Sequence, residues 1–250
     1  MLISPEHKFI FFKSMKTAGT SVEYGLLQQC GPNALCTGAS IDMGTGPKYS
    51  YKPTNNSIIV PNRSAKEDRF HSHTSPELFY SRIKNKHIYD NYKKITIVRN
   101  PWDQMVSYFW FNQKSSLNKN LNFSSKSIQR IVKAAWKLFL VKPVEHSNTE
   151  ILKNHFMKTK LISPEYISDV SEQMVSSCIT NYLRFENLKR DYSSLCYILD
   201  IPEEPLKRFK SGIRKLDKHY SWYYDDEDIE LVASLYPKTI EKFNYKFEKR

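Results

Sequence analysis

Short apolar runs recur along the chain, and amphipathic helical patterns lie between them. The runs are rich in β-branched and aromatic side chains, which is typical of strands that are buried on both faces of a parallel sheet. This pattern predicts an α/β fold with a central, mainly parallel sheet flanked by helices. The runs are Phe9–Phe12, Ser57–Val60, Lys94–Val98 and Asn181–Phe185.

Helical patterns are expected in three parts of the chain. The first helix should run from about Thr20 to Gln29, and several helices should occupy Ser124–Ser176. A third pattern opens with the acidic residues Asp225–Asp228, which suit the start of a helix. Pro237 should kink or divide that helix, because proline lacks a backbone donor and clashes with the preceding turn. The segment Gly31–Asn56 has little periodicity and is predicted to be an irregular insertion near the substrate.

Composition is consistent with one domain over residues 1–250, because 40% hydrophobic content in 250 residues can form one sizeable core. No internal repeat or linker argues for a second domain. The formal net charge of +12 makes the surface attractive to anions. A nucleic acid, a membrane surface, a nucleotide and an acidic polysaccharide all fit that charge, so charge alone does not identify the partner.

The cysteines form neither a C-x-x-C pair nor a site with histidine at metal spacing, so we predict reduced thiols and no zinc site. A Cys30–Cys36 disulfide is the alternative. No basic segment leads into a long apolar stretch at the N-terminus, and no apolar run approaches about 18 residues. We therefore expect a soluble protein, cytoplasmic or otherwise, without a signal peptide or membrane anchor. The cysteines are Cys30, Cys36, Cys178 and Cys196.

The loop after the first apolar run has residue types that suit an anion. Lys13–Ser21 brings two lysines, hydroxyl groups and backbone N–H groups to the junction of a strand and a helix. Ala18 and Gly19 allow close approach of the backbone, and Thr20 and Ser21 should cap the helix. An ordinary strand-to-helix turn is the alternative, and the spacing is not that of a nucleoside triphosphatase loop. The candidate site residues are Lys16, Thr17, Ala18, Gly19, Thr20 and Ser21.

A second strand-to-helix junction follows Lys94–Val98 and delivers Arg99 to a helix start. Asn100 is a candidate N-cap, and Pro101 suits the first helical position. Ser107 should lie on the polar side of this helix, away from its apolar stripe. Taken alone, Arg99 could simply pair with a local carboxylate. Both junctions follow parallel strands, however, so both should lie at the carboxyl edge of the sheet, where α/β proteins bind ligands.

At these two junctions the sequence resembles the sulfotransferase superfamily, and in particular the carbohydrate sulfotransferases related to heparan sulfate 2-O-sulfotransferase. Lys16–Ser21 looks like the family's 5′-phosphosulfate loop, and Arg99–Ser107 looks like its 3′-phosphate motif. Two positions differ from the family pattern. Met15 stands where the family commonly has proline, which affects the rigidity of the loop, and Gln104 stands where it often has arginine, which affects one surface contact. Further similar blocks are Tyr182–Leu188 with Asp191, Lys218–Tyr224 and Phe243–Phe247.

The resemblance implies transfer of a sulfuryl group from 3′-phosphoadenosine 5′-phosphosulfate to a hydroxyl acceptor, with a carbohydrate favoured. The product would be 3′,5′-bisphosphoadenosine, and the chemistry would need no metal. Lys16 would neutralise the leaving 5′-phosphate, while Arg99 and Ser107 would hold the 3′-phosphate. Arg214 and Lys215 resemble a donor-contacting loop of the family.

Two histidines are candidates for the base that takes the proton of the acceptor hydroxyl. Histidine titrates near neutrality, and His71 and His73 would point to the same side if they lay on a strand. A histidine before Thr74 is similar to the family's base, so His73 is preferred and His71 would assist. Glu186 is expected to be structural.

Two other functions use the same features. A nucleotide or sugar kinase could share the loop geometry, but it would need Mg²⁺ ligands and the missing loop spacing. A noncatalytic binder of nucleic acid or another polyanion would suit the positive charge, yet the basic residues are scattered and no recognised binding module occurs. Nucleic acid is therefore not expected as a partner, and the sequence does not determine the oligomeric state.

Overall fold

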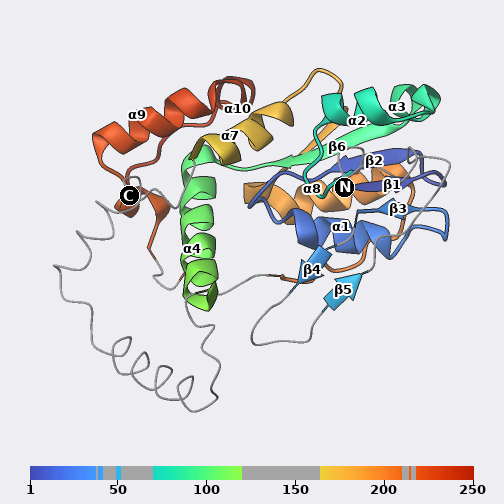
Figure 1. Ribbon diagram of the computed structural model, residues 1–250, viewed down its shortest axis with the longest axis horizontal. Coiled ribbons are helices and arrows are strands. Elements are labelled where there is room, and N and C mark those ends of the chain that lie inside the picture. The colour runs from blue at the N-terminus through green and yellow to red at the C-terminus, as the bar shows by residue number, and fades with distance from the viewer. Residues whose placement is uncertain (38, 42–48, 52–69, 120–163, 210–213, 215–217) are drawn as a thin grey trace, which may run out of the picture.

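The computed structural model describes residues 1–37, 39–41, 49–51, 70–119, 164–209, 214 and 218–250. Its main element is a five-stranded sheet with strand order β3-β1-β2-β6-β7 (Figure 1). A separate pair, β4 and β5, is antiparallel. The strands are β1 (Leu2–Ser4), β2 (Phe9–Phe12), β3 (Leu35–Cys36), β4 (Ala39–Ile41), β5 (Tyr49–Tyr51), β6 (Lys93–Val98) and β7 (Asn181–Arg184).

The centre of the sheet is parallel, as the apolar runs predict. β2 pairs with β6 and β6 pairs with β7, with Phe12 opposite Thr96 and Val98 opposite Arg184. β1 and β3 extend the sheet on the other side of β2 with antiparallel pairing, which the sequence analysis missed. The expected strand Ser57–Val60 lies outside the described residues.

The prediction that Gly31–Asn56 is irregular throughout is wrong, because β3, β4 and β5 fall within it. These strands have two or three residues each, which is too short for a period of two to stand out. Leu35 and Cys36 pair with residues at the N-terminus, so the signal for β3 lies far away in the sequence.

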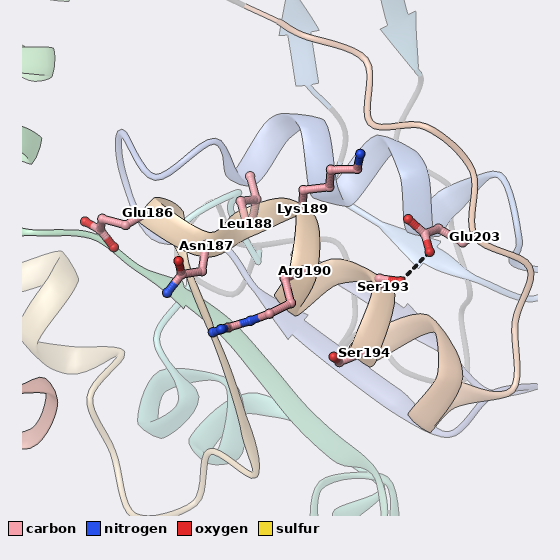
Figure 2. A pocket seen from close by; sticks show the side chains of 8 residues that line it. All are labelled: Glu186, Asn187, Leu188, Lys189, Arg190, Ser193, Ser194 and Glu203. Atoms are coloured by element: carbon pink, nitrogen blue, oxygen red, sulfur yellow. Dashed lines mark hydrogen bonds between the residues drawn. The ribbon is translucent and has the colours of Figure 1, made fainter.

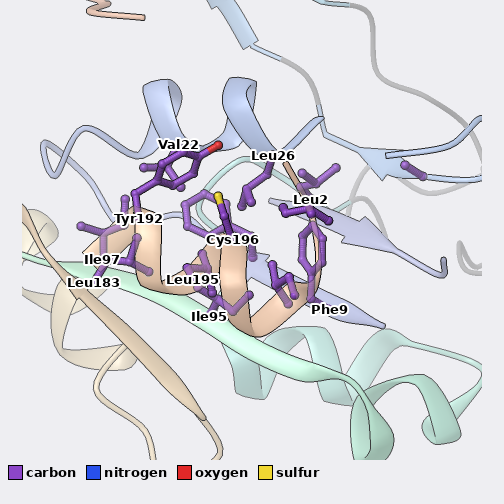
Figure 3. Packing of buried hydrophobic residues seen from close by; sticks show 14 of the residues in the cluster. Leu2, Phe9, Val22, Leu26, Ile95, Ile97, Leu183, Tyr192, Leu195 and Cys196 are labelled. Carbon is purple, nitrogen blue, oxygen red and sulfur yellow. The ribbon is translucent and has the colours of Figure 1, made fainter. Parts of the chain in front are cut away.

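Helices cover both faces of the sheet. On one face α1 and α8 pack over Phe9, Ile95 and Leu183 (Figure 3), and on the other face α2 and α3 pack over Ile10. Alternate residues of each strand thus enter different cores, as the pleat of a strand requires. These helices are α1 (Gly19–Leu27), α2 (Pro76–Arg82), α3 (Lys86–Asn91) and α8 (Leu188–Leu199).

A third apolar cluster joins α4 to the C-terminal part of the chain. Trp102, Met105, Val106 and Phe109 form the buried stripe of α4, as their helical spacing predicts. The expected division of the last helix is confirmed, since α9 ends before Pro237 and α10 begins at it. Of the helices expected over Ser124–Ser176, only α7 lies within the described residues. The elements are α4 (Pro101–Lys119), α7 (Pro164–Gln173), η2 (Phe185–Asn187), η3 (Tyr220–Tyr223), α9 (Asp226–Leu235) and α10 (Pro237–Phe243).

The four cysteines are free thiols, so Cys30 and Cys36 are not bridged. Burial raises the pKa of the Cys30 thiol to about 11, which keeps it protonated at neutral pH. Within the described ranges, no helix has both the length and the apolar character needed to cross a membrane.

Candidate functional site

A cavity of about 1210 Å³ opens at the carboxyl edge of the parallel strands. The residues that follow the three strands, Lys13 after β2, Arg99 after β6 and Phe185 after β7, all line it. Parallel strands deliver their next residues to one edge of a sheet, so three distant segments meet here. Of the residues that the sequence singled out, the cavity is lined by Lys16, Ala18, Gly19, Thr20, Ser21, His73, Arg99, Ser107 and Arg214.

The loop between β2 and α1 has a strained backbone. Lys16 and Ala18 have left-handed φ values of 59° and 62°. Each such residue costs about 1–2 kcal/mol, so the surrounding structure must hold the loop in place. The Ser14 hydroxyl donates a hydrogen bond to the Ile97 carbonyl at 2.8 Å and thereby ties the loop to β6.

Two side chains from the second junction hold the same loop. Arg99 donates to the Lys16 carbonyl at 2.7 Å, and the Gln104 amide donates to the Met15 carbonyl. Gln104 is only 1% exposed and also donates to the Ser171 hydroxyl of α7 at 2.8 Å. The expectation that Gln104 makes a surface contact is therefore wrong. The loop has no proline at Met15, but these hydrogen bonds restrain it instead.

The helices at the two junctions begin in different ways. α1 starts at Gly19 with Ala18 as N-cap and without a side-chain cap, so the expected capping by Thr20 and Ser21 is wrong. α4 is capped as predicted, because the Asn100 side-chain oxygen accepts from the N–H groups of Trp102 and Asp103 at 3.1 and 3.3 Å. Of these two helices, α1 is the one that turns an uncapped N-terminus, with its partial positive charge, toward the cavity.

A carboxylate binds two of the arginines that line the cavity. Asp103 lies 2.5 Å from the Arg99 guanidinium and 2.6 Å from that of Arg214. Burial alone would raise the pKa of Asp103, but the two arginines lower it below its usual range. The Arg99 guanidinium also stacks 3.8 Å from the centre of the Phe185 ring. The two cations are thus fixed in position on one wall.

Lys16 reaches across the cavity toward α4. Its ammonium group lies 4.0 Å from the centre of the Phe111 ring, which is one turn beyond Ser107 on the same helix. Lys16, Ser107 and Phe111 all line the cavity. The structure therefore brings a lysine of the first junction next to the helix of the second.

The two histidines lie in a turn before α2 and not on a strand, so the strand interpretation is wrong. Thr74 explains the turn, because its hydroxyl accepts from the His71 N–H at 2.8 Å and donates back to the His71 carbonyl. His73 lines the cavity, whereas His71 is exposed and does not. His71 instead accepts a hydrogen bond from the His73 backbone N–H at 3.2 Å.

The surroundings of His73 determine its tautomer. Its Nδ1 lies 2.8 Å from the Lys13 carbonyl oxygen, which can only accept, so Nδ1 carries the proton and Nε2 keeps its lone pair. Burial is the main cause that lowers the pKa of His73 to about 4. At neutral pH this side chain is therefore an uncharged imidazole with a free acceptor nitrogen.

Some expected residues are placed elsewhere. The Thr17 side chain is buried, and its hydroxyl bonds to Ser14 rather than lining the cavity. Lys215 lies outside the described residues. Sequence reasoning missed Glu23, which is fully buried and pairs with Lys13, because an isolated glutamate on a helix carries no motif. Glu186, which is expected to be structural, accepts from the Asn100 N–H at 2.6 Å.

A second hollow of about 500 Å³ lies beside the start of α8 (Figure 2). The Ser193 hydroxyl donates a hydrogen bond to the Glu203 carboxylate there. The two junctions contribute no residue to it, which leaves the larger cavity as the candidate active site.

This geometry defines an α/β protein with a cavity at the carboxyl edge of its sheet that is lined by basic residues and a neutral histidine. The sequence profile of the sulfotransferase family matches residues 1–246, and the chain belongs to that family. The family assignment supports sulfuryl transfer as the general activity. Comparisons with curated proteins and with solved structures returned no significant match.

Proposed function

We propose that the protein transfers a sulfuryl group from 3′-phosphoadenosine 5′-phosphosulfate to a hydroxyl group, with a carbohydrate as the acceptor. The observation that carries this proposal is the meeting of Lys16, Arg99 and His73 in one cavity, although they come from three distant segments. A cation at the leaving group, a cation at a second phosphate and a base are what this transfer requires.

The donor would lie with its phosphosulfate against the first junction. Lys16, the small residues Ala18 and Gly19 and the uncapped start of α1 suit a group with several anionic oxygens. Arg99, Arg214 and Ser107 would hold the 3′-phosphate at the second junction, where guanidinium groups can bind two oxygens at once. Lys215, next to Arg214, would contribute to the same contact.

Transfer would proceed as an in-line displacement. The acceptor oxygen bonds to sulfur while the bond from sulfur to the bridging phosphate oxygen breaks. Nε2 of His73 takes the proton of the hydroxyl, and Lys16 neutralises the charge that develops on the departing 5′-phosphate of 3′,5′-bisphosphoadenosine. His71 assists from outside the cavity by accepting from the His73 backbone. No covalent intermediate with the protein is needed, so positioning and electrostatics supply most of the rate.

A carbohydrate acceptor is supported by the resemblance to carbohydrate sulfotransferases and by two aromatic side chains. Trp110 and Phe111 line the same cavity as His73. Aromatic faces offer an apolar surface for the C–H groups of a sugar ring while leaving its hydroxyls to polar neighbours. A screen of sugars against a tyrosine peptide and simple alcohols, with release of the bisphosphate as readout, tests the acceptor class.

Thermal unfolding tests the donor site. Wild type should be stabilised by 3′,5′-bisphosphoadenosine more than by AMP or by ATP with magnesium, and Lys16→Ala should lose that shift. Lys249→Ala removes the same charge from a lysine that is 79% exposed and should keep the shift. Preferential stabilisation by ATP with magnesium would favour a kinase, and salt-dependent stabilisation by DNA alone would favour a polyanion binder.

A further inference from the structure

We propose that the buried ion pair between Lys13 and Glu23 positions and tunes the base, with the Lys13 carbonyl fixing the imidazole of His73 and the Glu23 carboxylate balancing the adjacent ammonium. The proposal rests on the proposed function, since it takes His73 as the base. Neither Lys13 nor Glu23 has a place in the transfer step itself. Both act through His73 and are therefore positioning residues.

Lys13 touches the site in three ways. Its carbonyl accepts from Nδ1 of His73 at 2.8 Å, and its side chain lines the cavity. Its aliphatic stem packs against the end of the loop between β2 and α1. A Cβ at Gly19 would lie only 2.4 Å from the Lys13 Cγ. Lys13 thus connects the loop to the base, which explains why glycine occupies position 19.

Glu23 holds the ammonium end of Lys13. The glutamate side chain is fully buried on α1, and one carboxylate oxygen pairs with Lys13 Nζ. The other oxygen lies 2.6 Å from the Met1 amino group, which also donates to the Ser72 carbonyl at 3.1 Å. Burial alone would raise the pKa of Glu23, but the Met1 amino group and Lys13 lower it below its usual range. The carboxylate is therefore ionised. It lies between the Lys13 ammonium and the Met1 amino group, whose own pKa is lowered by burial.

These charges surround His73. Among the described residues, the groups that act on its titration are Lys13 at the end of β2, the Met1 amino group at the start of β1 and His71 in its own turn. Burial has the largest effect and lowers the pKa of His73. The hydrogen bond to the Lys13 carbonyl favours protonation, whereas the charges of all three groups oppose it. Without Glu23 the positive charge of the Lys13 ammonium would be unbalanced, and the imidazole would become a weaker base.

The experiment is an NMR titration of the His73 ring in the donor-free protein, with the signals assigned by comparison with His73→Asn. Wild type should show the proton on Nδ1. Lys13→Met keeps the carbonyl and removes the ammonium, so the His73 pKa should rise by about one pH unit. Glu23→Gln should lower it by a similar amount, and the conservative Glu23→Asp should restore it toward wild type. Shifts of opposite sign separate a charge effect from a general loss of structure.

Activity gives the second readout. Glu23→Gln should lower kcat at the pH plateau while leaving the KM for the donor unchanged, because it weakens the base without touching the phosphates. If Glu23→Gln does not fold, Lys13→Met alone decides, since an unchanged His73 pKa in that variant overturns the proposal. Shifts of the same sign in both variants, or a proton on Nε2 in wild type, also overturn it. The titration needs no donor, so a failure of bisphosphate binding would refute the proposed function and leave this result standing.

Discussion

The two strand-to-helix junctions at the cavity offer different groups to a ligand. The β2–α1 junction has a strained loop, small residues and a helix start without a side-chain cap. The β6–α4 junction has an ordinary start, where Asn100 already satisfies the first N–H groups of the helix, and it offers the side chains of Arg99 and Ser107 instead. The first junction therefore offers backbone groups together with the Lys16 ammonium, and the second offers side chains alone.

The strained backbone of the first junction is held in place by side chains of the second. The first junction cannot hold its left-handed residues alone, so Arg99 and Gln104 of the second donate to the carbonyls of Lys16 and Met15. Arg99 therefore restrains the loop as well as lining the cavity. Variants that affect one junction should reveal how far each depends on the other.

The largest effect is expected for Lys16. Lys16→Ala should lower kcat by about 10²–10³-fold, because it removes the cation that neutralises the leaving phosphate in the transition state. Ser107→Ala removes one neutral hydroxyl from the second junction and should cost about tenfold or less. Initial rates at saturating donor measure both. A greater loss in Ser107→Ala would reverse the ranking of the two junctions.

His73 should make the stability of the protein sensitive to acid. Its folded pKa of about 4 lies below its ordinary value of 6.5, so between these values the unfolded chain binds more protons. Stability should fall as the pH drops from about 6.5 to 4, by up to about 3 kcal/mol. Urea unfolding at a series of pH values measures this, and His73→Asn should flatten the dependence.

Two neighbouring groups provide controls for that prediction. Asp103 has a lowered pKa, so its contribution is present above about pH 4 and is lost only below that range. The pKa of His71 is lowered as well, by partial desolvation and by the charge of Arg82, but the side chain is largely exposed, so His71→Asn should keep most of the slope. An unchanged slope in His73→Asn would show that another group is responsible.

Close packing at Gly19 provides the third test. Gly19→Ala should destabilise the protein by about 1–3 kcal/mol, because its Cβ would meet the buried stem of Lys13. It should also weaken bisphosphate binding, since the stem and the loop must separate. Gly31→Ala is the matched control, because its Cβ would meet only the carboxylate tip of Glu6. Thermal unfolding with and without the bisphosphate separates the two effects.

The sequence predicts these junctions well where the signal is local. The apolar runs predict β2, β6 and β7, and Asn100-Pro101 predicts the start of α4, because caps and buried strands depend on neighbouring residues. The left-handed residues, the Gln104 contact and the pairing of Lys13 with Glu23 depend on segments that meet only after folding. The turn at His71 depends on hydrogen bonds with the Thr74 hydroxyl. The alternate spacing of His71 and His73 predicts a strand instead, because it carries no sign of those bonds.

The smallest effects should separate the two helix starts most directly. Asn100→Ala removes a cap from α4 and should lower the free energy of unfolding by about 1 kcal/mol. Thr20→Ala removes no cap from α1, so stability should change by less than about 0.5 kcal/mol while bisphosphate affinity falls. Urea unfolding and bisphosphate titration of both variants give the comparison. If Thr20→Ala lowers the free energy of unfolding as much as Asn100→Ala does, Thr20 caps α1. The N–H groups at the start of α1 would then be occupied in the absence of a ligand.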